Sequence, residues 1–223
     1  MSKVLTPIEI GGVRIKNRVF LPGHTTNFGI NNLPTDRNAA YLSARAAGGT
    51  GLIITEAIRV HPTSAGRSST LGSSDDSCIP SFRKLTDAVH DNGAAIFAQI
   101  MHAGRQANGD ATHTAAWSAS AISWTKGGQT PHVMSQADIA TMVKAFGNSA
   151  VRMKSAGFDG LEVHLGHGHL IQQFLSPASN SRHDKYGGSL ENRMRFAIEV
   201  LSEIFARVPG MAVGVRFSAD EFM

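Results

Sequence analysis

Three histidines, His164, His167 and His169, stand within the stretch HLGHGH, directly after an apolar run. Their ring nitrogens permit several kinds of chemistry. As ligands they could hold a zinc ion together with Glu162 or Asp184, although their spacing matches no helical zinc signature. As N–H donors they could bind a substrate oxygen and stabilise an enolate-like charge. They could also be packing histidines that are bonded to the backbone of a loop.

Two further polar residues stand at predicted strand ends. Gln99 presents an amide donor and acceptor side by side, which suits the edge of a planar heterocycle such as a flavin. Arg216 is a fixed cation, which near the N1–C2=O region of a flavin would stabilise the anionic reduced ring. Each residue also has a structural interpretation. Gln99 could be a buried amide bonded to the backbone, and Arg216 could form a salt bridge at the mouth of a barrel. Together with the histidines they favour a bound aromatic cofactor.

These side chains must be positioned by strands and helices that alternate along the chain. Short apolar runs predict strands buried on both faces, as in parallel sheets, at 19–23, 51–57, 94–100, 160–164 and 211–217. Helical periodicity predicts helices over about 38–47, 80–90, 139–153 and 194–205. In the last helix the predicted apolar face is Met194, Ala197, Ile198, Leu201, Ile204 and Phe205.

Turn and capping residues mark the ends of several elements. The stretch IEIGGVRIKN alternates apolar and polar residues around Gly11 and Gly12, which predicts a β-hairpin over 7–17. Ser135 and Asp138 stand at capping-box spacing and predict a helix start.

The predicted class is α/β, because strands and helices alternate. A Rossmann sheet would need a G-x-G-x-x-G stretch after the first strand, and the sequence has none there, nor a Walker A motif. Polar residues gather just after the strands, where barrel enzymes place their chemistry. We therefore predict a (β/α)8 TIM barrel. A complete barrel needs eight units in about 250 residues, so we expect residues 1–223 to form a partial domain with strands 1–5, and strands 6–8 to be absent.

Composition narrows the class of protein. The 223 residues carry a formal net charge of +4 and 42% hydrophobic residues. Lys and Arg do not cluster with aromatics, so we expect no nucleic-acid partner, and no apolar run reaches the length of a membrane span. The single cysteine, Cys78, allows no internal disulfide and fits a reducing, cytoplasmic location. We expect a small-molecule substrate, with homo-oligomerisation left open.

Long stretches of the chain resemble a known family. LTPIEIGGVRIKNRVFLPG, GLIITEA, AQIMHAGRQ, VGVRFS and the long segment GFDGLEVHLGHGHLIQQFLSPASNSRHDKYGGSLENRMRFAIEVL are similar to the old yellow enzyme family of FMN-dependent oxidoreductases. The long segment is highly specific. The resemblance implies a TIM barrel with FMN at its C-terminal mouth, reduced by NADH or NADPH and reoxidised by an organic substrate.

The resemblance also implies roles for individual positions. His164 and His167 match the pair that binds the substrate oxygen, and with His169 they are the expected catalytic residues. Phe28 is expected to line the substrate pocket. The positions that match the family's FMN-binding residues are Pro22, Gly23, His24, Thr25, Ala57, Gln99 and Arg216.

One departure concerns the acid. The family usually has tyrosine at the position of His169, and that tyrosine protonates the substrate. Histidine can act as an acid near neutral pH. The first-strand loop PGHTTNFG resembles the multidomain branch with dienoyl-CoA reductases, trimethylamine dehydrogenase and N-methyl amino-acid demethylases, which implies a 4Fe-4S cluster and FAD on a C-terminal region outside these residues. Thr25 stands where trimethylamine dehydrogenase links its flavin through cysteine, so non-covalent FMN is expected.

Two functional hypotheses from different classes follow. The leading one is an FMN-dependent oxidoreductase that performs either C=C reduction or oxidative N-demethylation, with the fragment alone weakly active or inactive. The alternative is a metal-dependent barrel hydrolase that uses His164, His167 and His169. The alternative leaves Gln99 and Arg216 unexplained.

Overall fold

The main sheet of the computed structural model follows the chain in order. Residues 3–64, 67–108 and 112–222 are described. The sheet path runs β11-β10-β7-β4-β3, and each neighbouring pair is parallel. The five strands are β3 (Phe20–Leu21), β4 (Leu52–Ile54), β7 (Ala95–Met101), β10 (Gly160–Leu165) and β11 (Ala212–Phe217). The order never reverses, which is typical of a barrel, whereas a doubly wound sheet changes direction at a switch point.

Short elements extend and flank this sheet. Strand β5 (Ile58–Arg59) pairs with β7, and β6 (Leu71–Gly72) pairs with β5. Strands β8 (Trp117–Ser118) and β9 (His132–Val133) form a separate small sheet. The 3-10 helices are η1 (Lys3–Leu5), η2 (Pro62–Ser64), η3 (Asp76–Cys78) and η4 (Gly104–Gln106).

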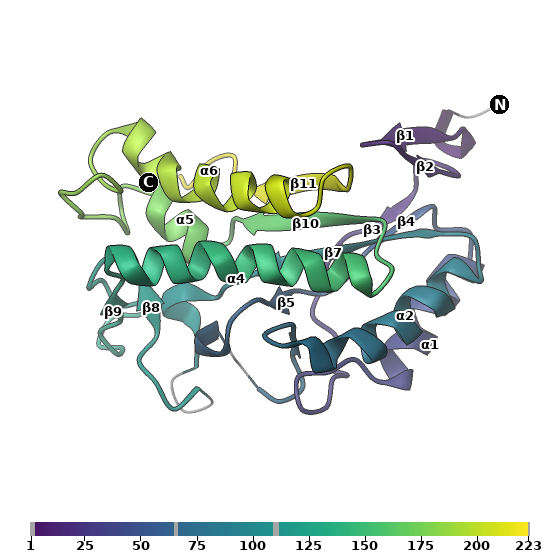
Figure 1. Ribbon diagram of the computed structural model, residues 1–223, viewed down its shortest axis with the longest axis horizontal. Helices are drawn as coiled ribbons and strands as arrows, with labels where there is room; N and C mark the ends of the chain where they lie inside the picture. The colour runs from purple at the N-terminus through teal and green to yellow at the C-terminus, as the bar shows by residue number, and fades with distance from the viewer. Residues whose placement is uncertain (1–2, 65–66, 109–111, 223) are drawn as a thin grey trace.

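Helices cover one face of the sheet (Figure 1). They are α1 (Asp36–Ala47), α2 (Ile79–His90), α4 (Gln136–Ser155) and α6 (Leu190–Arg207), with the short α5 (Leu170–Leu175) after β10. The capping box predicted at α4 is confirmed, because Ser135 Oγ accepts from the Asp138 N–H and Asp138 Oδ2 accepts from the Ser135 N–H. Within the described ranges no helix is both long and apolar enough to cross a bilayer.

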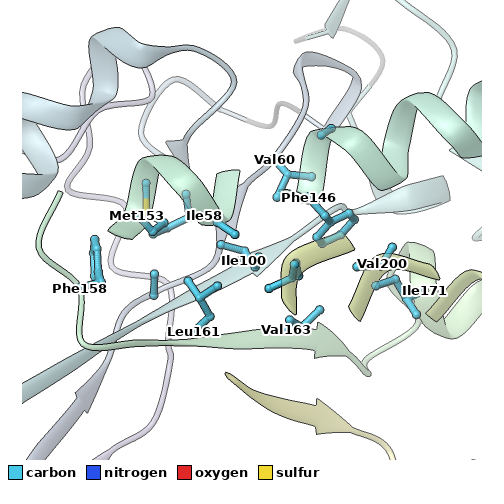
Figure 2. Packing of buried hydrophobic residues seen from close by; sticks show 14 of the residues in the cluster. Ile58, Val60, Ile100, Phe146, Met153, Phe158, Leu161, Val163, Ile171 and Val200 are labelled. Carbon is cyan, nitrogen blue, oxygen red and sulfur yellow. The ribbon is translucent and has the colours of Figure 1, made fainter. Parts of the chain in front are cut away.

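The larger core lies between the sheet and these helices. Figure 2 shows Ile100 and Leu161 of the sheet on the side of α4, from which Phe146 and Met153 come. All four side chains are fully buried. Each such side chain contributes about 1.5–3 kcal/mol of burial free energy, which fixes the helix layer on the strands.

A smaller core fills the opposite face of the sheet. Strands β1 (Ile8–Ile10) and β2 (Val13–Ile15) form the predicted hairpin, and its turn residues Gly11 and Gly12 have φ of 56° and 82°. Two consecutive positive φ values require residues such as glycine. Ile15 of the hairpin packs against Leu52, Ile54, Phe97 and Ala212 of the sheet. In Figure 1 the arrow of β10 points away from this hairpin and toward α5, so the carboxyl end of this strand lies at the opposite end of the sheet from the hairpin.

The predicted apolar face of α6 is partly wrong. Met194, Ile198 and Phe205 are 39%, 52% and 54% exposed. The buried residues of α6 are Phe196, Ala197, Val200 and Ile204. The rotation follows from packing, because α6 lies against α4 and α5 and turns the rest of its apolar stripe outward.

Candidate active site

Four polar residues point to the same inner face of the sheet, the face opposite the helices. Gln99 of β7 lies beside Glu162 of β10 in the parallel register, and His164 lies beside Arg216 of β11. Side chains alternate along a strand, so Glu162 and His164 share one face. Gln99 Nε2 donates to Glu162 Oε1 at 2.6 Å, and the Gln99 side chain is buried. The structure thus brings Gln99, His164 and Arg216 together, as predicted, and adds Glu162.

Gly23 allows the loop after β3 to approach Gln99. A Cβ atom at residue 23 would lie 2.6 Å from the carbonyl oxygen of Thr55 and 2.7 Å from Gln99 Nε2. Neither distance leaves room for a side chain, so glycine is required by close approach here. The main chain at Gly23 therefore borders the same space as the Gln99 amide.

Hydrogen bonds fix the tautomers of the histidine pair. The Gly166 N–H donates to His164 Nδ1 at 3.1 Å, so the proton of the neutral ring is on Nε2. His164 Nε2 is 3.2 Å from His167 Nδ1, which must then accept. His167 consequently carries its own proton on Nε2. Burial lowers the pKa of His164 to about 3, with smaller contributions from His169, His167 and Arg216. His164 is therefore neutral near pH 7.

His169 stands at the N-cap of α5, with its ring centroid 4.8 Å from that of His164. Its Nδ1 is buried and has no hydrogen-bond partner within the described part of the chain. Burial, with smaller contributions from the nearby His167 and Arg59, lowers the pKa of His169 to about 4. The neutral ring is therefore the dominant form at neutral pH.

The same hydrogen bonds disfavour the metal reading. One nitrogen from each of His164, His167 and His169 lies within 4.8 Å of the others, which is close enough for three ligands to one ion. A ligand nitrogen needs a free lone pair. In His164, however, the Nδ1 lone pair accepts from Gly166 and Nε2 carries the proton. His164 therefore acts as a donor in this geometry, and a three-histidine metal site would require that loop to rearrange.

The first-strand loop contacts helix α1. His24 Nε2 lies 2.8 Å from the Tyr41 hydroxyl, and His24 Nδ1 lies 3.2 Å from the Pro22 carbonyl oxygen. The Phe28 ring packs edge-on against Tyr41. Among the described contacts, none joins Phe28 to the histidine cluster, so its role in the substrate pocket stays a prediction. Thr25 is exposed on the same loop.

Below this loop lies a buried carboxylate that we did not assign to the site from sequence. Glu56 follows β4, directly before the half-buried Ala57, and Glu56 Oε1 accepts from the Thr26 hydroxyl and, at 3.2 Å, from Asn38 Nδ2. Burial raises the pKa of Glu56, whereas the hydrogen bond from Thr26 lowers it. Glu56 thus ties the first-strand loop to α1 and holds Thr26 in place.

A comparison with known protein families identifies the family of this chain. The sequence profile of the NADH:flavin oxidoreductase / NADH oxidase family, the old yellow enzyme family, matches residues 3–223. The chain belongs to this family.

Comparisons with individual proteins support this family assignment. The chain is 41% identical over 219 residues to an NADH oxidase of Thermoanaerobacter brockii, which covers 96% of this chain and 34% of that protein. It is 37% identical over 226 residues to 12-oxophytodienoate reductase 1 of Oryza sativa subsp. japonica, covering 96% of this chain and 58% of that protein. A solved 2-naphthoyl-CoA reductase in complex with 2-naphthoyl-CoA superposes with a TM-score of 0.91 at 32% identity, over 96% of this chain and 35% of that one.

Membership of the old yellow enzyme family confirms the predicted fold class. The five parallel strands and their helices form part of a (β/α)8 barrel. The chain spans between about a third and three fifths of the length of these relatives.

The residues on the inner face fit the flavin of this family. Gly23 allows the main chain of the first-strand loop to lie close to the Gln99 side chain, whose amide can pair with the edge of a planar ring. Among the described residues Arg216 forms no salt bridge on this face, so its charge is available to an anionic ring. Sequence reasoning named Glu162 only as a candidate zinc ligand and missed its hydrogen bond to Gln99, although its position two residues before His164 already placed it on the same face.

Proposed function

We propose that this chain provides the FMN and substrate site of an NADH- or NADPH-dependent oxidoreductase that reduces a C=C bond conjugated to a carbonyl group. The observation that carries the proposal is the directional hydrogen-bond chain from Gly166 through His164 to His167. It leaves the His167 Nε2–H as a donor for the carbonyl oxygen of the substrate. A donor there stabilises the negative charge that develops on that oxygen.

The FMN-binding residues in this proposal are Gly23, Gln99 and Arg216, with Pro22, His24, Thr25 and Ala57 supplying loop contacts. When bound, FMN supplies hydride transfer between the nicotinamide and the organic substrate. Gln99 orients the ring edge, and its bond to Glu162 holds the amide in one orientation. Arg216 supplies a positive charge near the reduced ring. In this proposal His169 delivers a proton to the substrate carbon.

The second candidate is oxidative N-demethylation, and the state of His169 favours it. A ring with a pKa of about 4 is neutral near pH 7 and is a weak proton source. Hydride removal from an N-methyl carbon needs no acid at that position. In this case His164 and His167 would bind a carboxylate of the amino-acid substrate.

The test combines a spectrum with two substrate classes. The protein is mixed with excess FMN, desalted, and its visible spectrum is recorded before and after NADH or NADPH. A retained flavin band that bleaches, followed by reoxidation with cyclohexenone, supports C=C reduction. Bleaching by an N-methylated amino acid supports demethylation instead. No retained flavin in a form that contains all eight barrel strands would refute both, and bound stoichiometric zinc would favour the hydrolase.

Three finer proposals concern the whole protein. We propose that residues 1–223 supply the first five barrel strands, and that activity of this part alone is weak. If the protein belongs to the multidomain branch, an iron–sulfur cluster and FAD would lie outside these residues, which iron analysis would detect. We place the protein in the cytoplasm, where the buried thiol of Cys78 would stay reduced.

A further inference from the structure

A cavity adjoins the histidine loop, and the residues that line it have no role in the site described above. It has a volume of about 240 Å³ and lies between η4 and the loop that follows β8. Arg105, Gln106, Trp124 and Gln129 are among its lining residues. None of the described residues that line it is acidic. The cavity therefore combines a cation, amide groups and an indole ring.

Arg105 is held at this cavity with unused hydrogen-bonding capacity. Its Nη1 donates to the Ile122 carbonyl oxygen at 3.2 Å, and its main-chain N–H donates to Gln173 Oε1 at 3.1 Å. Its guanidinium carbon lies 5.4 Å from the centroid of the Trp124 ring. Its Nε is buried without a partner in the described part of the chain. An unpaired donor on a charged group is costly, and an anionic oxygen would satisfy it.

Among the described residues, little negative charge lies close to the Arg105 guanidinium. Burial lowers the pKa of Arg105, and the carboxylate of Glu221 raises it. Glu221 itself accepts a hydrogen bond from Gln172 Nε2 at 2.6 Å. No carboxylate of the described residues forms a salt bridge with Arg105.

Two residues that line the cavity contact the loop of the proposed substrate site. Gln106 Nε2 donates to the His167 carbonyl oxygen at 2.8 Å. Gly168 has φ of 70°, and a Cβ there would lie 2.8 Å from Trp124 Cζ3 and 2.9 Å from Gln106 Nε2. The indole and the amide thus lie directly on the loop that carries His167 and His169. The cavity therefore lies beside the loop that carries His167, the proposed donor to the substrate oxygen.

We propose that Arg105 and Trp124 form an outer subsite that binds an anionic carboxylate or phosphate group attached to a planar part of the ligand. The indole face accepts the planar part, and the guanidinium accepts the anionic oxygen. The anion can come from either of two ligands of the proposed reaction, the diphosphate of the nicotinamide coenzyme or a carboxylate of the organic substrate. The subsite rests on the proposed function for its ligands, but its ability to bind anions can be measured without turnover.

The test compares R105Q with K126Q in the FMN-loaded protein. Lys126 is an exposed cation of the same loop and does not line the cavity. One arm measures KM for NADH and NADPH. The other arm measures the concentration that half-saturates reoxidation of the dithionite-reduced protein, first with 3-benzoylacrylate and then with its methyl ester. These two compounds differ in the anionic charge. R105Q should raise KM about tenfold or more in the arm whose ligand carries the recognised anion, because a hydrogen bond to a charged group is lost. In R105Q, kcat and the KM for the methyl ester should change by less than about twofold. In K126Q, all of these values should change by less than about twofold.

A binding measurement separates this inference from the proposed activity. Trp fluorescence is titrated with ADP-ribose, with cinnamate and with the neutral cinnamyl alcohol. Quenching by at least one anion that is weakened about tenfold in R105Q and retained in K126Q supports the subsite, even in a protein that retains no flavin. Equal effects of R105Q on cinnamate and cinnamyl alcohol, or no effect on any ligand in either experiment, would overturn it.

Discussion

Acid should destabilise this protein through its buried histidines, and His169 offers the sharpest test. An unfolded histidine has an ordinary pKa of 6.5, whereas burial lowers the pKa of His169 to about 4 and that of His164 to about 3. As pH falls below 6.5, the unfolded state takes up protons that the folded state does not. The contribution of each neutral ring to the unfolding free energy is therefore fully present above about pH 6.5. It is lost progressively as the pH falls from 6.5 toward the pKa of that ring in the folded state.

The size of the effect follows from these values. Between pH 7 and pH 5 each ring should cost about 2 kcal/mol of unfolding free energy, because the unfolded pKa lies about 1.5 units above pH 5. The substitution H169Y places the family's usual tyrosine at this position and removes the contribution of His169. Between pH 7 and pH 5 the unfolding free energy of H169Y should therefore fall by about 2 kcal/mol less than that of the parent.

The assay is urea unfolding at pH 5, 6, 7 and 8, read as the difference between pH values within each variant. Any constant change in stability caused by the new side chain then cancels. H183Y is the matched control, because His183 is exposed and should leave the pH dependence of the parent unchanged. An H169Y protein with the same slope as the parent would refute the claim that this ring is kept neutral by burial.

Three further predictions concern binding and packing. Replacing Gln99 with alanine should weaken FMN binding about tenfold to a hundredfold, since it removes hydrogen bonds to the ring edge, as flavin fluorescence titration would show. G160A should lower the unfolding free energy by about 1–3 kcal/mol, because a Cβ would lie 2.7 Å from the Phe97 ring, whereas G214A on the adjacent strand has room and should change it by less than about 1 kcal/mol. R182Q should cost about 2–4 kcal/mol in the same assay, because Arg182 donates to two carbonyl oxygens and pairs with Asp184; a loss below about 0.5 kcal/mol would contradict that account.

The sequence by itself determined the elements and the side on which key residues point. Apolar runs of strand length between helical periods were sufficient for the five parallel strands, because burial on both faces leaves a continuous apolar pattern. The two-residue period of a strand put Glu162 and His164 on one face, and strand ends placed Gln99 and Arg216 near them. The Gly11 and Gly12 turn was also visible, since few other residues tolerate its backbone angles.

Tertiary structure decided what those side chains can do. The residues HLGHGH are compatible with ligands, donors or packing, and only the Gly166 N–H on His164 Nδ1 selects the donor tautomer. Burial, which depends on the whole packed molecule, sets the low pKa of His169. The direction of the α6 stripe and the meeting of Arg105 with Trp124 depend on how distant segments pack. Local periodicity cannot encode contacts between such segments, and these contacts determine the chemistry of the site.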